Sequence, residues 1–205
     1  MRDRHPSRRH GSAPRPKAGR WLLLVIFMTA AIPFGAAWWM TGHPEWIERT
    51  SNYGHLVVPV ITLDSAALTR GLADPALEPE IRGHWILLQM AGQGCEAVCL
   101  DSLYKSHQSW LMLNKEMSRV RRLLLTDEES VFSMPAVKRD DALAIGRSPA
   151  GLRALLLELS GSAGLEGALF LVDPQGNLAL WYAPGFDPYR LVKDLKHLLR
   201  ASQIG

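Results

Sequence analysis

Two cysteines, Cys95 and Cys99, are the only ones in this 205-residue chain, and they form a Cys-x-x-x-Cys pair. The thiolate form of cysteine attacks disulfide bonds, and it is also a soft donor that selects Cu(I). Outside the reducing cytoplasm, two cysteines this close can instead oxidise to an inert disulfide, whose five-residue loop would stabilise the fold only modestly. The pair therefore indicates one of three things: a redox couple, a copper site or a structural crosslink.

The cysteines lie between an expected strand and an expected helix. Residues 85–90 are an apolar run, which is typical of a central strand buried on both faces. A helix is expected from about residue 98 to 119, with an apolar face formed by Leu103, Trp110, Leu113, Met117 and Val120. In α/β sheets this carboxyl edge is where sites are built, and a helix N-terminus stabilises a thiolate through its N–H groups and partial charge. The position favours a functional pair over an inert disulfide.

The rest of the C-terminal region predicts a mixed α/β domain. A β-branched run interrupted by Pro59 indicates an edge strand, the turn residues 173–177 indicate a hairpin, and Asp187-Pro188 is a typical helix start. The expected strands are 55–63, 85–90, 121–126, 168–172 and 178–182; the expected helices are 98–119, 149–160 and 187 onward; 64–83 and 127–148 are expected as turns and loops. This order predicts a central mixed sheet flanked by helices.

Residues 21–44 contain no Asp, Glu, Lys or Arg, and Trp21–Met40 is almost wholly apolar. Twenty helical residues span about 30 Å, which is the thickness of a bilayer's hydrocarbon core. Trp21 and the pair Trp38-Trp39 mark the two ends, where indoles favour the membrane interface. The segment therefore predicts one transmembrane helix; the alternative is a cleaved signal peptide, whose apolar region is usually shorter.

Charge gives the expected orientation of this helix. Residues 1–20 hold seven basic residues and one acid, whereas the remaining chain holds 16 basic and 19 acidic residues. The high pI belongs to the tail and gives no support for nucleic-acid binding. Positive flanks stay on the cytoplasmic side, so we expect a cytoplasmic N-terminus in the inner (plasma) membrane and a periplasmic domain. The expected parts are a basic tail (1–20), a transmembrane helix (21–40), a linker (41–53) and the outer domain (54–205).

Residues 94–99 (Gly-Cys-Glu-Ala-Val-Cys) after an apolar strand, residues 170–176 (Phe-Leu-Val-Asp-Pro-Gln-Gly) and the anchor together resemble the Sco/SenC proteins. Those are membrane-anchored, copper-handling assembly factors that help to deliver or redox-prepare copper for the Cu-A centre of cytochrome c oxidase. The resemblance covers roughly residues 54–200 and implies a thioredoxin-like fold. It also implies copper as the cofactor, Cys95 and Cys99 as its ligands or as a redox pair, and oxidase subunits or other assembly factors as partners.

The chain departs from this family at two positions. Leu100 follows the second cysteine, where Sco proteins have proline, and Leu165 stands eight residues before Asp173-Pro174, where they have a copper-ligating histidine. The proline that thioredoxin-type oxidoreductases place before the strand facing their cysteines is also missing, since residues 160–168 contain none. Other donors considered are His84, His107, His197, Met90 and Met134, for each of which an ordinary surface or core role is favoured.

Three functions are consistent with these observations. The first is an assembly factor for cytochrome c oxidase that acts on copper, or on the thiols of the copper site, through Cys95 and Cys99. The second is a periplasmic thiol–disulfide oxidoreductase in which Cys95 attacks and Cys99 resolves the mixed disulfide. The third is a non-catalytic docking subunit of the same pathway, with 181–186 (Trp-Tyr-Ala-Pro-Gly-Phe) as a contact surface. The first and third make the chain a non-enzyme.

Overall fold

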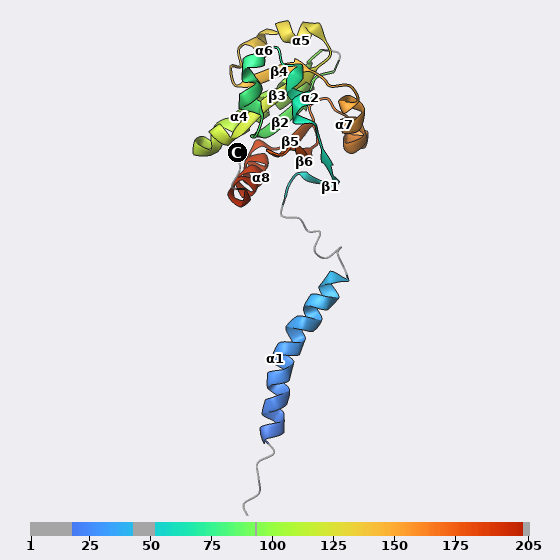
Figure 1. Ribbon diagram of the computed structural model, residues 1–205, viewed down its shortest axis with the longest axis vertical. Helices are drawn as coiled ribbons and strands as arrows, with labels where there is room; N and C mark the ends of the chain where they lie inside the picture. Colours follow the sequence, from blue (N-terminus) through green and yellow to red (C-terminus); the bar gives the residue numbers. More distant parts are fainter. Residues whose placement is uncertain (1–17, 43–51, 93, 203–205) are drawn as a thin grey trace, which may run out of the picture. The chain divides into compact units, whose positions relative to one another are not determined.

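The computed structural model describes residues 18–42, 52–92 and 94–202, without the side chains of 18–20, 23 and 41. The chain divides into two compact units between Thr50 and Ser51, which are described separately here (Figure 1). The predicted basic tail, up to residue 17, and most of the predicted linker, residues 43–51, lie outside the described residues.

The first unit contains one helix, α1 (Ala18–Thr41), which is 24 residues long and has Pro33 in its interior. The segment that was expected to be helical, 21–40, is therefore helical. Judged on the described residues alone, none of the helices has both the length and the apolar character needed to cross a membrane.

The second unit is built on a six-stranded sheet with the order β1-β6-β5-β2-β3-β4. Its strands are β1 (His55–Thr62), β2 (Trp85–Met90), β3 (Val120–Thr126), β4 (Leu143–Arg147), β5 (Leu169–Val172) and β6 (Asn177–Tyr182). The pairs β2–β3 and β3–β4 are parallel, and β1–β6, β6–β5 and β5–β2 are antiparallel. The central mixed sheet is thus confirmed, with β1 at one edge and β2 in the interior, as predicted.

The helices of this domain differ from the predicted ones at two places. They are α2 (Ser65–Arg70), η2 (Pro75–Leu77), α3 (Glu78–Ile81), α4 (Ala97–Leu111), η3 (Asn114–Arg119), α5 (Glu129–Ser133), α6 (Pro135–Lys138), α7 (Leu152–Ser160), η4 (Gly161–Ala163) and α8 (Pro188–Ala201). The expected turns at 64–83 contain three short helices, and the expected loop at 127–148 contains α5, α6 and β4. These elements are too short to show a hydrophobic period, and β4 exists because β3 offers it a parallel partner.

Two hydrophobic layers cover the sheet. Ile86, Leu88 and Met90 of β2 face a cluster that includes Leu152 and Leu156 of α7. On the other face, Leu171 and Leu180 belong to a cluster with the buried leucines of α8. Figure 1 shows α4 and α8 on one side of the sheet and α2 and α7 on the other.

Helix α4 departs from its predicted packing. It ends at Leu111, and a 3₁₀ segment, η3, follows where the helix was expected to continue. Its buried residues are Cys99, Ser102, Leu103, Ser106 and Ser109. Three of the five are serines, so the inner face is small and polar rather than the expected apolar stripe. The reason lies in β3, which directs a buried arginine, Arg122, at this face.

Candidate functional site

Cys95, just before the N-cap of α4, and Cys99, in its first turn, form a disulfide with a Cα–Cα distance of 5.1 Å. Both residues are 3% exposed. Cys95 was expected to be the attacking thiol, but the equal burial of the two residues gives no preference to either. The pair lies at the carboxyl edge of β2, as predicted. Two of the three proposed roles, a redox couple and a structural crosslink, involve a disulfide and agree with this bond.

An apolar cluster surrounds the disulfide. The two cysteines pack with buried residues from six elements or their adjoining loops: Ala91, Leu103, Leu124, Val131, Val137 and Leu143. Leu100 and Met134 are partly buried against the same cluster. Leu100, which stands where the Sco family has proline, therefore contributes an apolar cover. A partner thiol can reach the sulfur atoms only if part of this cover moves.

The start of α4 favours a thiolate once the disulfide is reduced. Glu96 is the N-cap residue, and its side chain makes no capping hydrogen bond. The first N–H groups of a helix have no partner within the helix and carry its positive partial charge, which stabilises an anion nearby. The apolar cluster acts in the opposite direction, since an apolar environment disfavours the charged thiolate. The two effects leave a dithiol whose reactivity depends on how far the cluster opens.

Gly167, just before β5, lies against Val98, which is in the first turn of α4 between the two cysteines. Its φ is +76°, and a Cβ added there would lie 2.7 Å from Cγ1 and 3.0 Å from the carbonyl oxygen of Val98. The segment before β5 thus faces the turn of α4 that carries the cysteines. Gly167 was not among the expected site residues. A glycine two residues before a strand was the available signal, since glycine there often marks a close backbone approach.

Arg153 of α7 is bonded to the start of the segment that connects β2 to Cys95. Its Nη2 donates a hydrogen bond of 2.8 Å to the carbonyl oxygen of Ala91, the first residue after β2. Its Nε lies 3.6 Å from Asp127 Oδ2. Because Ala91 is four residues before Cys95, this bond fixes the point at which the chain leaves the sheet for the cysteine loop. Nothing in the sequence pattern marks Arg153 among the other exposed charges.

Behind the cysteines, a buried polar array connects α4 to the sheet. Gln89 of β2 donates to Ser102 Oγ at 2.6 Å and accepts from Ser106 Oγ at 2.8 Å. Arg122 of β3 donates to Ser106 Oγ at 3.1 Å and to the carbonyl oxygen of Leu103 at 2.9 Å. These bonds fix the register of α4, and hence of Cys99, against β2 and β3. The serine spacing of four residues in the expected helix was the signal for this array.

Arg122 is neutralised by Asp140, which follows α6. The Arg122 side chain is 0% exposed, and its Nη1 donates to Asp140 Oδ2 at 2.6 Å. His107 Nδ1 lies 3.1 Å from Asp140 Oδ1. Burial lowers the pKa of Arg122 from its ordinary value, against the hydrogen bond and charge of Asp140. Burial acts to raise the pKa of Asp140, but the hydrogen bonds and charges of Arg122 and His107 outweigh it and hold that pKa below 3.8.

The donors considered from the sequence do not gather around the cysteines. Leu165, at the position of the family histidine, and Met90 are buried in the cluster on the α7 side. Of the two methionines, Met134 alone packs against the cysteine cluster. Within the described part of the chain, no three His, Cys, Asp or Glu residues are grouped so that they could hold a metal ion.

The remaining histidines have other surroundings. His84 Nδ1 lies 3.1 Å from the carbonyl oxygen of Arg82, and His107 lies next to Asp140 and Arg122. His197 is exposed on α8. The ordinary surface or structural roles favoured for them are consistent with these positions.

Comparison with known proteins agrees with the domain's architecture. Residues 85–202 match the family described as "Transmembrane-like, thioredoxin-like, C-terminal domain". No curated protein matches the chain. The match covers more than half of the sequence and spans β2 to α8, with both cysteines and the polar array. The domain is thus of the thioredoxin-like class, and the chain belongs to this family of transmembrane-like, thioredoxin-like C-terminal domains.

Solved structures of the same class include two copper-bound Sco proteins and one oxidoreductase. Copper-bound ScoI of Arabidopsis thaliana is 15% identical, with 59% of this chain and 87% of that chain covered and a TM-score of 0.47. Copper-bound Sco1 of yeast is 13% identical, with 59% of this chain and 81% of that chain covered and a TM-score of 0.47. The thioredoxin domain of a thiol-disulfide oxidoreductase from Bacteroides vulgatus is 16% identical, with 72% of this chain and 99% of that chain covered and a TM-score of 0.44.

Proposed function

We propose that this chain is a membrane-anchored assembly factor for cytochrome c oxidase, and that its Cys95–Cys99 pair acts on the thiols of the oxidase copper site. The observation that carries the proposal is the disulfide at the junction of β2 and α4 in a thioredoxin-like domain. The oxidase pathway itself is supported by the sequence resemblance to the Sco/SenC proteins in residues 94–99 and 170–176.

The exchange reaction uses the chain in its reduced form. One thiolate of the pair attacks a disulfide of the client, forms a mixed disulfide and expels the first client thiolate. The second thiolate then attacks the mixed disulfide, expels the second client thiolate and leaves the Cys95–Cys99 disulfide. Two electrons pass from the pair to the client, and a dithiol donor must reduce the pair again. Thiols released in this way are the form of cysteine that binds copper.

Copper binding by the pair itself is the second part of this proposal. Two thiolates are sufficient donors for Cu(I), whereas a stable Cu(II) site needs a further ligand such as imidazole. Leu165 occupies the position of the family histidine and packs in a different cluster. We therefore propose that any copper held here is Cu(I) in transit between partners.

The exchange can be tested with a peptide that carries the two cysteines of a copper site as a disulfide. The reduced wild-type chain should convert it to the dithiol, and Cys95→Ser and Cys99→Ser should each abolish the full cycle. One of the two single variants should accumulate a mixed disulfide with the peptide, which identifies the attacking thiol. Peptide reduction that persists in the double variant would refute the proposal.

Copper transfer needs a separate measurement. Cu(I) titration under reducing conditions should give one equivalent bound by the wild-type chain and none by the double variant Cys95→Ser/Cys99→Ser. Binding that survives in the double variant would refute a dithiolate site.

The burial of the disulfide also favours the alternative of a non-catalytic docking subunit, since both cysteines are enclosed in the apolar cluster. A strain that carries Cys95→Ser/Cys99→Ser distinguishes the two. Normal oxidase assembly in that strain would support docking alone, whereas loss of assembly that is restored by an added dithiol reductant would support the thiol reaction. A general oxidoreductase would instead reduce unrelated disulfides as fast as the copper-site peptide.

We further propose that α1 anchors the chain in the inner (plasma) membrane, with residues 1–20 in the cytoplasm and the thioredoxin-like domain in the periplasm. The support is the uncharged sequence 21–44, the basic tail before it and the exposure of large apolar side chains of α1, among them Phe27 and Phe34. Alkaline carbonate should leave the full chain in the membrane fraction, and external protease should digest the domain only after the outer membrane is opened. Release by carbonate would refute the anchor.

A further inference from the structure

Helix α8 presents a basic face to solvent. Its inner residues include Leu191, Leu195 and Leu199, which are buried in the core. The outer positions carry the basic residues Arg190, Lys193, Lys196, His197 and Arg200. The only acid of the helix, Asp194, is buried and accepts hydrogen bonds from the backbone of Tyr53 and Gly54. The helix α8 therefore has no exposed carboxylate to neutralise its basic residues.

This face concentrates the positive charge of an otherwise acidic domain. Residues 52–202 contain 15 basic and 17 acidic residues. Four of these basic residues and one of these acids belong to α8, so the rest of the domain has 11 basic and 16 acidic residues. Charge is thus separated within the domain, and the α8 face is the part that attracts an anionic partner.

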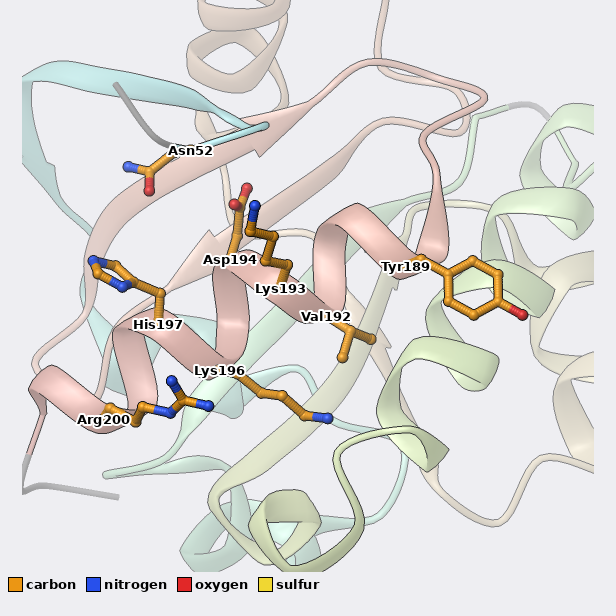
Figure 2. A pocket seen from close by; sticks show the side chains of 8 residues that line it. All are labelled: Asn52, Tyr189, Val192, Lys193, Asp194, Lys196, His197 and Arg200. Carbon is orange, nitrogen blue, oxygen red and sulfur yellow. The ribbon is translucent and has the colours of Figure 1, made fainter. Parts of the chain in front are cut away.

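The basic side chains border two adjoining hollows. One, of about 480 Å³, is lined by Asn52 together with Lys193, Asp194, Lys196, His197 and Arg200 of α8. Figure 2 shows these side chains around the helix, with Asn52 on the neighbouring segment. Lys196 and Arg200 also border the second hollow, to which η3 adds Lys115, Glu116 and Arg119. At the start of α8, Tyr189 is an aromatic side chain with 76% exposure that lines the first hollow.

The chain enters the domain on this same face and is fastened there. Asp194 accepts hydrogen bonds from the backbone N–H groups of Tyr53, at 2.9 Å, and Gly54, at 2.9 Å. The Arg190 guanidinium lies over the Tyr53 ring, 4.0 Å from its centroid. The backbone N–H of Asp187 donates to the Tyr53 hydroxyl at 3.1 Å. The segment through which the chain enters the domain is therefore bonded directly to the basic face of α8.

We propose that the α8 face docks the domain on an anionic lipid bilayer, with Lys193, Lys196 and Arg200 against the lipid phosphates. This inference rests on the proposed membrane anchor. The first described residue of the domain, Asn52, lines the same hollow as these basic residues, so the basic face includes the point where the chain enters the domain. Basic clusters next to an anchor attract anionic lipid, and exposed tyrosine favours the interface, where Tyr189 would lie. Docking would hold the cysteine pair at a constant height above the membrane.

The test uses the full chain in lipid nanodiscs. A fluorophore is attached to Ala201→Cys at the end of α8 or, as the control position, to Ser130→Cys on α5. Both sites are exposed, and Figure 1 shows α5 and α8 at opposite ends of the domain. The native cysteines do not compete for the label because they are bonded to each other. A nitroxide on the lipid headgroups quenches a fluorophore that approaches the bilayer, in discs of phosphatidylcholine alone or mixed with phosphatidylglycerol.

Quenching at position 201 should increase when phosphatidylglycerol is added, and quenching at position 130 should not. The triple variant Lys193→Gln/Lys196→Gln/Arg200→Gln should remove the increase. Each basic residue near an anionic surface changes the docking equilibrium roughly fivefold, so the loss of three changes it on the order of a hundredfold. The matched variant Arg70→Gln/Lys138→Gln/Arg139→Gln makes the same change in net charge at exposed positions outside α8 and should keep the increase.

Equal quenching at position 201 in both kinds of disc would overturn the inference, and so would an equal loss in the two triple variants. A chain that does not enter nanodiscs at all would refute the anchor, and the docking inference with it. Because incorporation is measured separately by co-elution with the discs, failure of docking and failure of the anchor are distinguishable.

Discussion

Removal of the Asp140 carboxylate should destabilise the domain because it leaves the Arg122 guanidinium as a buried charge without a counter-charge. The Arg122 side chain is completely buried, and its hydrogen bond to Asp140 is 2.6 Å long. In Asp140→Ala the guanidinium keeps its bonds to Ser106 and to the carbonyl oxygen of Leu103, which are neutral acceptors. His107, the other neighbour, carries no negative charge. The array that fixes α4, and with it Cys99, would then contain an unpaired cation.

The size of the effect follows from this burial. Removing one partner of a buried ion pair typically costs about 3–5 kcal/mol. Asp140 itself retains 14% side-chain exposure, so water can reach the vacated space, and we expect the lower end of that range, about 3 kcal/mol. For a domain of this size, that corresponds to a decrease in Tm of roughly 6–12 °C.

Thermal unfolding followed by circular dichroism measures this effect, with Asp141→Ala as the matched control. Asp141 is the next residue and is exposed, so its removal should change stability by no more than about 0.5 kcal/mol. The double variant Arg122→Met/Asp140→Ala should recover most of the loss, because an apolar pair of similar volume often replaces a buried ion pair without cost. Equal stability of the two single variants, or a double variant as unstable as the sum of its parts, would refute the reasoning.

Four further outcomes are expected. Because the pKa of Asp140 in the folded chain is held below 3.8, its pair with Arg122 contributes fully to the free energy of unfolding above about pH 3.8. This contribution is lost as the pH falls through the lower pKa of the folded state. Acid titration of the wild type should show this loss of stability, and the Arg122→Met/Asp140→Ala variant should not. Asp194→Ala removes the acceptor for Tyr53, Gly54 and Tyr182, and should lower the free energy of unfolding, measured by urea denaturation, by about 3 kcal/mol. The control Asp187→Ala removes only the exposed N-cap bond of α8 and should lower it by about 1 kcal/mol. Gly167→Ala should be more destabilising than Gly185→Ala, because both have positive φ but only Gly167 has an atom of Val98 within 2.7 Å of the new Cβ; equal losses in unfolding free energy would exclude the steric contact. Reduction of the Cys95–Cys99 bond should lower the unfolding free energy by only about 2 kcal/mol, since its loop is short, and a much larger loss would favour a structural crosslink.

The parts of the fold that were predictable have long or strongly punctuated patterns. β2 is six consecutive buried residues, and the hairpin of β5 and β6 is marked by Asp173, which accepts bonds from the N–H groups of Gln175 and Asn177. α8 begins at the predicted proline, with Asp187 as its N-cap. By contrast, β4 has five residues, and the alternation that identifies a strand cannot be recognised over so short a segment.

The candidate site was predictable only in part. Cysteine is chemically distinctive, and the transition from an apolar run to a helical pattern places the pair at an edge of the sheet. The residues that position the pair come from distant positions: Gly167 before β5, Arg153 on α7, and Asp140 after α6. Each is an ordinary residue type for its local sequence, so its role depends on contacts between segments that lie far apart along the chain.

By itself, the sequence determined which residues can do chemistry, the order of the main elements and the separation of a basic tail and an apolar helix from an acidic domain. These depend on residue type and on local period, which the sequence contains directly. Only the tertiary structure decided that the cysteines are bonded to each other and equally buried, that Leu165 packs away from them, and that the basic residues of α8 share a face with the point where the chain enters the domain. Those features depend on which side of the sheet each element packs against, and that choice is made by the combined burial of residues distant in sequence.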